Sequence, residues 1–312
     1  MRIIWGLILA AGAVASSTLG QTTRPAFIVE GTGAAYDRLA EAVDAIGAGQ
    51  GTIVIAPGTY RQCAVQQAGR IAYRAATPGT VIFDGKICDG KAALVLKGTA
   101  ASIDGLIFQN MRVADGNGAG IRLQQGDLTV TRTLFRNSEE GILTHDDPDG
   151  SIRIDQSTFR HLGRCDRGLS CAHSIYVGNY GSVSVTNSRF DQGDGGHYLK
   201  ARSAKVNIVN NSFDDSRGHL TNYMIDLSNG ASGLIADNEM EQGRDKDNYT
   251  VFISVAPEGR KHSSTGLVVR NNSARFSPGI ERNSSFVANW SDDKVTITGN
   301  RLASGIKLTD RR

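Results

Sequence analysis

The sequence lacks an excess of charge of either sign. Its 312 residues include 34 Lys and Arg and 31 Asp and Glu, so the formal net charge is only +3. Proteins that bind nucleic acid through its phosphates normally present a broad basic face, and we therefore expect no nucleic acid partner. Glycine is abundant instead, at 37 of 312 residues, or about 12% compared with about 7% on average. This surplus favours many turns or tightly stacked backbone.

Long apolar runs are also missing beyond the N-terminus, so we expect no membrane span. Residues 1–20 start with a positive charge at Arg2, continue with an apolar stretch and reach the small residues Ala13-Val14-Ala15. This order is typical of a secretory signal peptide, and the alternative is an uncleaved anchor. We predict an exported protein, periplasmic or secreted, with a single domain over residues 21–312 that is a monomer.

The four cysteines show no CxxC spacing, and nearby histidines do not complete a zinc pattern. In an exported chain an even number of cysteines predicts disulfides. Cys165 and Cys171 bracket a short loop, which favours one bridge between them. Cys63 and Cys88 would form the second bridge, and free buried thiols are the alternative.

One pattern recurs along the chain: two alternating aliphatic residues precede a large apolar residue by five positions. From Phe108 to Leu302 it spans 194 residues in seven steps, a mean period of about 28. Alternation with period two indicates strands, and coils of this length stack into a solenoid. A β-sandwich would instead show hairpins with tight two-residue turns. The clearest repeats are Ala101-Ile103-Phe108, Leu128-Val130-Phe135, Ile152-Ile154-Phe159, Val183-Val185-Phe190 and Val206-Ile208-Phe213.

The repeat predicts two stacked columns. The phenylalanines should form one column in the interior, and the asparagines that precede the large apolar residues should form the other. Asparagine tolerates the left-handed backbone region, and its side chain can bond from coil to coil in a tight turn. These asparagines are Asn187, Asn210, Asn211, Asn238, Asn271 and Asn300. With a coil of about 25 residues, Cys63 and Cys88 would lie on adjacent coils, about 4.8 Å apart.

The segment Gly51-Thr-Ile-Val-Ile-Ala-Pro-Gly-Thr-Tyr60 resembles the opening coil of right-handed parallel β-helix proteins of the pectate-lyase-like superfamily. The asparagine and phenylalanine columns strengthen this resemblance, which covers roughly residues 30–308. Residues 36–47 place four apolar side chains on one helical face, like the helix that caps such solenoids: Leu39, Ala42, Val43 and Ile46. The resemblance implies an all-β right-handed parallel β-helix solenoid with a short N-terminal capping helix.

Stacked coils place polar residues in columns on the outer face. Taking the aliphatic residues of each second strand as inward, one outward column is Arg122, Leu143, Tyr176, Lys200, Asp226 and Ser254. The neighbouring column is Gln124, His145, Gly178, Arg202 and Ser228. A register slip of one residue would reverse both assignments.

The resemblance also implies a substrate class, because members of this superfamily often act on acidic polysaccharides. A β-eliminating enzyme must neutralise a uronate carboxylate, remove the C5 proton and protonate the leaving oxygen. Lys200 and Arg202 are our candidate pair, one of them the base if burial and neighbouring cations lower its pKa. His197, Tyr198 and Tyr176 are the candidate proton donors. We expect Lys200→Ala and Arg202→Ala to remove turnover and leave the fold intact.

The stretch Lys200-Ala201-Arg202-Ser203 followed by Asn210-Asn211-Ser212-Phe213 is similar to the Lys-Ser…Asn-Asn-Thr-Phe stretch of the chondroitinase B and alginate lyase family. The lysine is the base in that family, and the spacing here fits Arg202 better than Lys200. The calcium-binding acids of that family, the Arg-x-Pro-x-x-Arg signature of pectate lyases and the Asn-Thr-Asp motif of polygalacturonases have no clear counterpart.

Other assignments stay open. Lys200 and Asp226 would form an exposed structural ion pair between coils, of little energetic value. The protein would then be a carbohydrate-binding or envelope-structural β-helix. A glycoside hydrolase using Asp146, Asp147 or Asp226 is a further alternative. The carboxylates of residues 146–149 would also suit calcium, although their composition is that of an ordinary turn; we predict no other cofactor or metal.

Further candidates for contact with an acidic polysaccharide lie around this face. His145, Tyr176 and Asp226 belong to the outward columns. Arg217, His219 and Tyr223 belong to a longer loop that would wall a groove. We expect His161 and His262 to be surface residues.

Overall fold

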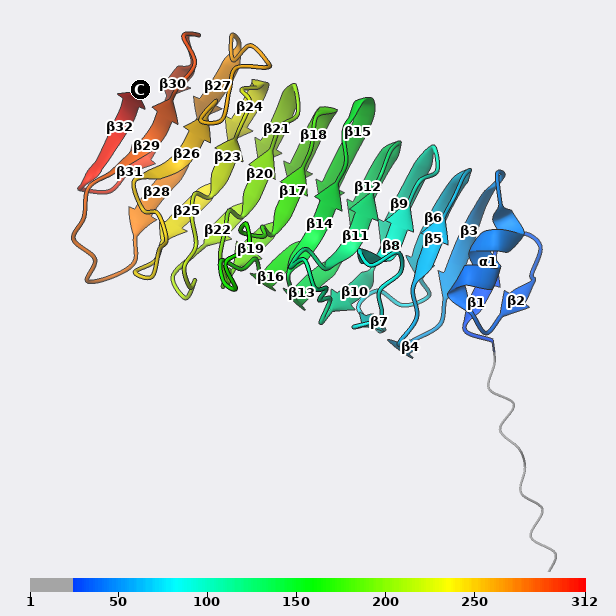
Figure 1. The fold of residues 1–312 in the computed structure, drawn as a ribbon. Helices are drawn as coiled ribbons and strands as arrows, with labels where there is room; N and C mark the ends of the chain where they lie inside the picture. The colour runs from blue at the N-terminus through cyan, green and yellow to red at the C-terminus, as the bar shows by residue number, and fades with distance from the viewer. Residues whose placement is uncertain (1–24) are drawn as a thin grey trace, which may run out of the picture.

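The computed structural model describes residues 25–312, and the predicted signal peptide lies outside this range. Figure 1 shows an elongated stack of coils that begins beside the helix α1 (Leu39–Ile46) and ends at the C-terminus. Each complete coil adds one strand to each of three sheets, which we name A, B and C. No helix within residues 25–312 is long and apolar enough to cross a membrane.

The strands follow one another in space in the order of their coils. Sheet A is β2 (Ala35–Tyr36), β1 (Phe27–Val29), β3 (Gln50–Ile55), β6 (Arg70–Ala75), β9 (Ala100–Asp104), β12 (Asp127–Thr131), β15 (Asp147–Asp155), β18 (Tyr180–Thr186), β21 (Lys205–Val209), β24 (Ser232–Ala236), β27 (Leu267–Arg270) and β30 (Thr296–Thr298). Sheet B is β4 (Gly58–Tyr60), β7 (Val81–Asp84), β10 (Leu106–Gln109), β13 (Leu134–Ser138), β16 (Thr158–Leu162), β19 (Arg189–Asp191), β22 (Ser212–Asp214), β25 (Glu239–Gln242), β28 (Ser273–Phe276) and β31 (Arg301–Leu302). Sheet C is β5 (Ala64–Gln66), β8 (Ala92–Leu96), β11 (Ala119–Leu123), β14 (Glu140–Thr144), β17 (Ile175–Val177), β20 (Leu199–Ala201), β23 (Ile225–Leu227), β26 (Val251–Val255), β29 (Ser284–Asn289) and β32 (Ile306–Arg311).

Neighbouring coils pair in parallel, and antiparallel pairing between strands occurs only where β1 meets β2 and β3 at the N-terminal end of residues 25–312. This arrangement confirms the predicted right-handed parallel β-helix. The predicted capping helix is also confirmed: α1 buries Leu39, Ala42 and Val43 against the first coil. Its apolar face covers strand edges that would otherwise stay open.

The predicted phenylalanine column fills the interior. Phe108, Phe135, Phe159, Phe190 and Phe213 are fully buried, and successive rings stack with centroids 4.7–5.2 Å apart. Glycines of sheet C make room for the column. A Cβ at Gly120 would approach Phe135 to 2.7 Å, and one at Gly141 would approach Phe159 to 2.9 Å. The one-coil spacing of the repeat therefore corresponds directly to ring stacking.

The asparagines divide into two structural roles. Asn187, Asn210 and Asn271 adopt positive φ at the turn, as predicted. Asn211, Asn238, Asn272 and Asn300 form the coil-to-coil ladder, in which each side-chain oxygen accepts the backbone N–H of the preceding rung. The ladder satisfies buried polar groups that no strand partner reaches.

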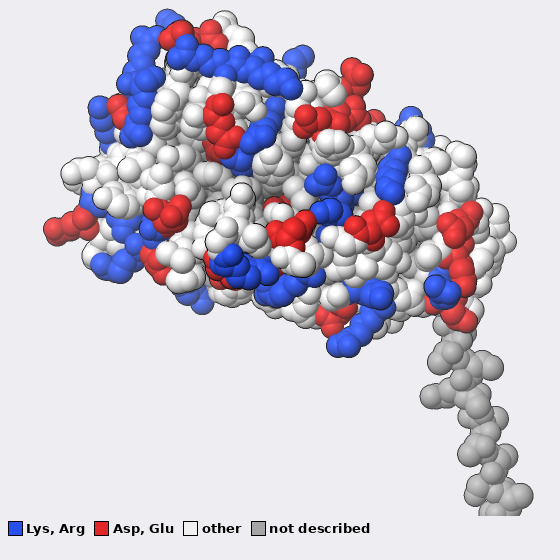
Figure 2. All heavy atoms as spheres, in the orientation of Figure 1, with Lys and Arg blue, Asp and Glu red and all other residues white. Residues whose placement is uncertain are grey.

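Both predicted disulfides are present. Cys63 and Cys88 join adjacent coils with Cα atoms 5.6 Å apart, and Cys165 and Cys171 close the short loop. Acidic and basic side chains are interspersed over the face drawn in Figure 2 and do not form one broad field. This mixture agrees with the near-neutral net charge.

Candidate functional site

A cleft lies on the outer face of sheet C, across the coils of β11, β14, β17 and β20. The register pairs Tyr176 with Lys200 and Lys200 with Asp226, which confirms the predicted outward column. The cleft has a volume of about 520 Å³. The charged and polar side chains that line it include Arg122, Glu140, His173, Tyr176, Lys200, Arg202 and Glu258.

An ion network links one side of the cleft. The Lys200 ammonium lies 3.0 Å from Asp226 Oδ2 and also donates to Glu258 Oε1. The other oxygen of Glu258 accepts a hydrogen bond from Arg202 Nη2 at 2.5 Å. The Arg202 guanidinium lies over the Tyr176 ring, 5.4 Å from its centroid. One carboxylate therefore bridges the two cations that the sequence singled out.

The surroundings of Lys200 change two expectations. Burial by itself lowers the pKa of Lys200, but Asp226 and Glu258 outweigh it, so this pKa is raised and not lowered. In the free protein Lys200 is a cation and not a ready base. Its side chain is only 7% exposed, so the predicted ion pair with Asp226 is present but buried. The expectation that this pair is exposed is therefore wrong, and Lys200→Ala would strand a buried carboxylate.

Glu258 was missed by the sequence analysis. It lies in the loop after β26, 58 residues from Lys200. The Glu258 backbone N–H donates to the Ser228 carbonyl at 2.9 Å, and the His262 ring nitrogen Nε2 lies 2.9 Å from Asn179 Oδ1. The loop thus folds back over earlier coils, and His262, expected on the surface, helps to fix it. The spacing of residues in the sequence does not predict a contact made by a loop of this kind.

Arg122 and Glu140 form the opposite side of the cleft. Arg122 is the first member of the predicted outward column, and Glu140 starts the adjacent strand β14. Among the described residues, Arg122 Nε and Glu140 Oε2 are buried without hydrogen-bond partners. Burial lowers the pKa of Arg122 and raises that of Glu140 well above its ordinary value. The sequence signal for Glu140 was weak, because its side chain belongs to neither predicted column.

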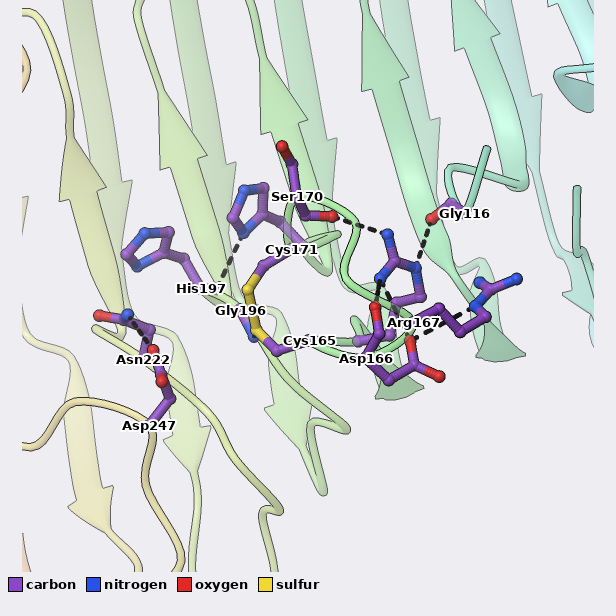
Figure 3. The surroundings of a disulfide bond; sticks show 12 residues. Gly116, Cys165, Asp166, Arg167, Ser170, Cys171, Gly196, His197, Asn222 and Asp247 are labelled. Carbon is purple, nitrogen blue, oxygen red and sulfur yellow. Dashed lines mark hydrogen bonds and ion pairs between the residues drawn. A yellow bond between two sulfur atoms is a disulfide. The ribbon is translucent and has the colours of Figure 1, made fainter. Parts of the chain in front are cut away.

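The disulfide loop walls this side of the cleft. Ser170 and Cys171 line it, and the buried Arg164 guanidinium donates to the Ser170 carbonyl at 2.6 Å and to the Gly116 carbonyl at 3.0 Å. Figure 3 shows the bridge between Cys165 and Cys171 beside Gly196. The Gly196 backbone N–H donates to Cys165 Sγ at 3.2 Å. The bridge and the arginine together hold the wall in place.

Two histidines stack behind the lysine. The His173 and His197 rings have centroids 4.9 Å apart, and His173 Nδ1 accepts the His197 backbone N–H at 3.0 Å. Burial, with a further contribution from Lys200, lowers the pKa of both rings well below the ordinary value, so both are neutral at pH 7. His197 Nε2 lies 3.5 Å from Asp226, and the Tyr223 ring packs on His197 at 5.3 Å.

Tyr198 is the clearest correction among the candidate donors. It was expected on the outer face, but its ring is 1% exposed and packs edge-on against Phe190 and Phe213. Its hydroxyl donates to Asp215 at 2.7 Å. Because Asp215 is itself paired with the buried Lys246, Tyr198 belongs to an interior network and not to the cleft.

The remaining candidates lie apart from the cleft. His145 is exposed in a separate hollow, where Asp146 and Asp147 accept backbone N–H groups of Asn179 and Gly126 on the neighbouring coils. Residues 147–150, whose composition predicted a turn, begin strand β15 instead. Arg217 and His219 are exposed on their loop, and His219 lies 2.5 Å from Asp245. Asp226 belongs to the ion network of Lys200 but is itself buried, and it accepts hydrogen bonds from the Ser228 and Ser254 hydroxyls. No group of three or more His, Cys, Asp or Glu side chains in residues 25–312 is placed to hold a metal ion, so the suggested calcium site gains no support.

Comparisons with known proteins bear on the fold. No protein-family model and no curated protein sequence matches this chain. Among solved structures, it is similar to a pectin methylesterase from Aspergillus niger, with 14% identity, a TM-score of 0.52 and coverage of 80% of this chain and 85% of that one. It is also similar to an alginate lyase from Paenibacillus sp. str. FPU-7, with 17% identity, a TM-score of 0.51 and coverage of 83% and 90%. A protein of Geobacillus virus E2 matches with 12% identity, a TM-score of 0.54 and coverage of 87% and 56%. At these identities the likeness establishes the parallel β-helix fold alone.

Proposed function

We propose that this protein is an exported polysaccharide lyase that binds a uronate-containing polymer in the cleft and cleaves it by β-elimination. The observation that carries the proposal is the Lys200–Glu258–Arg202 bridge. A carboxylate already lies between the two cations, and Glu258, with a side chain 41% exposed, is accessible to solvent. A uronate carboxylate offers the same two oxygens in the same geometry. Substrate would therefore take the place of Glu258 on Arg202.

Each group would have a role in the elimination. Arg202 neutralises the substrate carboxylate, which makes the adjacent C5 proton more acidic. Lys200 takes this proton once it has lost its own, so the rate should rise with pH toward the raised pKa of Lys200. Tyr176, which lies under Arg202, packs against the sugar. Two similar folds, an alginate lyase and a pectin methylesterase, lend support to a polysaccharide partner.

The test is a panel of uronate polymers incubated with the protein. New ultraviolet absorbance from an unsaturated product, with an equal number of new reducing ends, is the expected result. Arg202→Ala should lower the rate by about 10²-fold or more. Arg153→Ala is the matched control, because Arg153 is exposed on β15 of sheet A.

Three other outcomes would contradict the proposal. Reducing ends without ultraviolet absorbance would indicate a hydrolase. Saturable binding without cleavage would indicate a carbohydrate-binding protein. An Arg202→Ala variant that cleaves at the wild-type rate would show that this cleft is not the active site.

A further inference from the structure

One oxygen of the buried Glu140 side chain, Oε2, lies at the cleft without a hydrogen-bond partner among the described residues. Glu140 is 2% exposed, it lines the cleft, and its Oε2 atom accepts or donates no hydrogen bond among the described residues. A buried polar atom left unpaired is costly, and native structures rarely contain one without a reason. A ligand that enters the cleft would supply the missing partner.

The adjacent residue shows that this is not a general property of the segment. Glu139 is equally buried, but it accepts hydrogen bonds from the backbone N–H groups of Val113 and Gly118 at 2.9 and 2.8 Å. It also accepts from Arg167 at 2.5 Å. Glu139 therefore ties two loops of the cleft wall together, whereas the Oε2 atom of Glu140 holds no neighbour. The two neighbouring glutamates therefore differ in pairing: hydrogen bonds satisfy the Glu139 carboxylate, whereas one oxygen of Glu140 is left without a partner.

The charged groups around Glu140 come from several coils. Arg122 on β11 and Arg164 after β16 favour its ionised form, Asp115 opposes it, and a backbone hydrogen bond involving His173 favours it. Tyr176 on β17 is also close enough to be affected by Glu140. Burial outweighs these influences and raises the pKa of Glu140 well above its ordinary value, which favours the protonated carboxyl that a proton donor requires.

We propose that Glu140 is the proton donor of the cleft, which transfers its Oε2 proton to the glycosidic oxygen as the C–O bond breaks. This role rests on the proposed lyase function. In the elimination, the C5–H bond breaks and its proton goes to the base, while its electron pair forms the C4–C5 double bond. The C4–O bond breaks, its electron pair stays on oxygen, and Glu140 supplies the proton to that oxygen. Arg122 stabilises the Glu140 carboxylate that results, and solvent then reprotonates it.

The decisive variant is Glu140→Gln, which keeps the shape of the side chain and removes the acidic proton. On a polymer, the rate should fall by about 10²–10⁴-fold. On a uronate substrate that carries fluoride or nitrophenolate at C4, the leaving group needs no proton, so the rate should fall by roughly threefold or less. Ionisation of Glu140 should stop the wild-type rate from rising further with pH, whereas the rate of Glu140→Gln should keep rising toward the raised pKa of Lys200.

A second measurement detects the protonated Glu140 carboxyl directly and does not depend on catalysis. The infrared difference spectrum between wild type and Glu140→Gln at neutral pH should contain the carbonyl band of a protonated carboxyl. Absence of this band, or a Glu140→Gln variant that cleaves polymer at the wild-type rate, overturns the assignment alone. A wild-type protein that cleaves no uronate polymer overturns the proposed function, and the donor role with it, even where the band is present.

Discussion

The pair Glu139 and Glu140 makes a stability prediction that needs no substrate. Glu139→Gln removes a charge that holds two backbone N–H groups and Arg167. We expect it to lower the free energy of unfolding by about 2–4 kcal/mol, because the donors it leaves are partly unsatisfied. Glu140→Gln replaces one neutral group by another, and at neutral pH it should not lower the stability.

The free energy of unfolding should depend on pH through the Glu140 carboxyl, with a sign and a slope that follow from its raised pKa. Burial raises the pKa of folded Glu140, whereas in the unfolded chain its pKa is about 4.3. Below that value both states hold the proton, and the contribution of Glu140 to stability is fully present. Above it the unfolded chain releases a proton that the folded chain keeps, so the wild type loses about 1.4 kcal/mol per pH unit. The loss continues until the pH passes the folded pKa.

Urea denaturation from pH 4 to pH 9 measures both effects. The difference in the free energy of unfolding, Glu140→Gln minus wild type, should rise with pH at about 1.4 kcal/mol per unit until the pH passes the folded pKa of Glu140. A flat difference would refute a proton held by folded Glu140. A loss as large as that of Glu139→Gln would show that Glu140 is a structural carboxylate.

Two further predictions test the fold and the ion network. Phe190→Ala should lower the free energy of unfolding by about 3–5 kcal/mol, measured by urea denaturation; the same change at the half-buried Phe276 should cost less, and equal losses would contradict a tightly stacked column. Lys200→Ala should lower it by about 3–5 kcal/mol because it leaves Asp226 buried and uncompensated. Arg202→Ala should change it by about 1 kcal/mol or less, since its partner is on the surface; equal thermal stability of both variants would contradict the burial of the network.

The sequence predicted the features that recur from coil to coil and few of the features that occur once. The phenylalanine column, the asparagine turns and the bridge between Cys63 and Cys88 all follow from one coil length, because parallel stacking places equivalent positions of successive coils in contact. The outward column that contains Tyr176 and Lys200 followed from the same register. Period-two alternation is sufficient for such inferences wherever strands are regular.

Contacts made by loops could not be predicted in this way, because loops do not follow the strand register. Glu258 reaches Lys200 from a loop 58 residues away, and no period predicts how such a loop folds back. Tyr198 failed for a related reason: it precedes β20 at the end of an irregular turn, where alternation no longer determines which side faces the interior. The lowered pKa expected for Lys200 is wrong because neighbours in the sequence are cations, whereas its nearest partners in space, Asp226 and Glu258, are anions.

Three of the seven side chains in residues 25–312 that keep a buried polar atom without a hydrogen-bond partner line the cleft. Along the asparagine ladder, buried donors and acceptors meet with a partner on the next coil. At the cleft, Arg122, Glu140 and Arg202 each keep a buried polar atom without one. A regular stack satisfies its own polar groups almost automatically, so groups left unpaired in a single hollow require a separate cause. A polar ligand that pairs with these groups when it binds is such a cause. It would explain why the protein keeps unpaired polar atoms here, although they lower its stability.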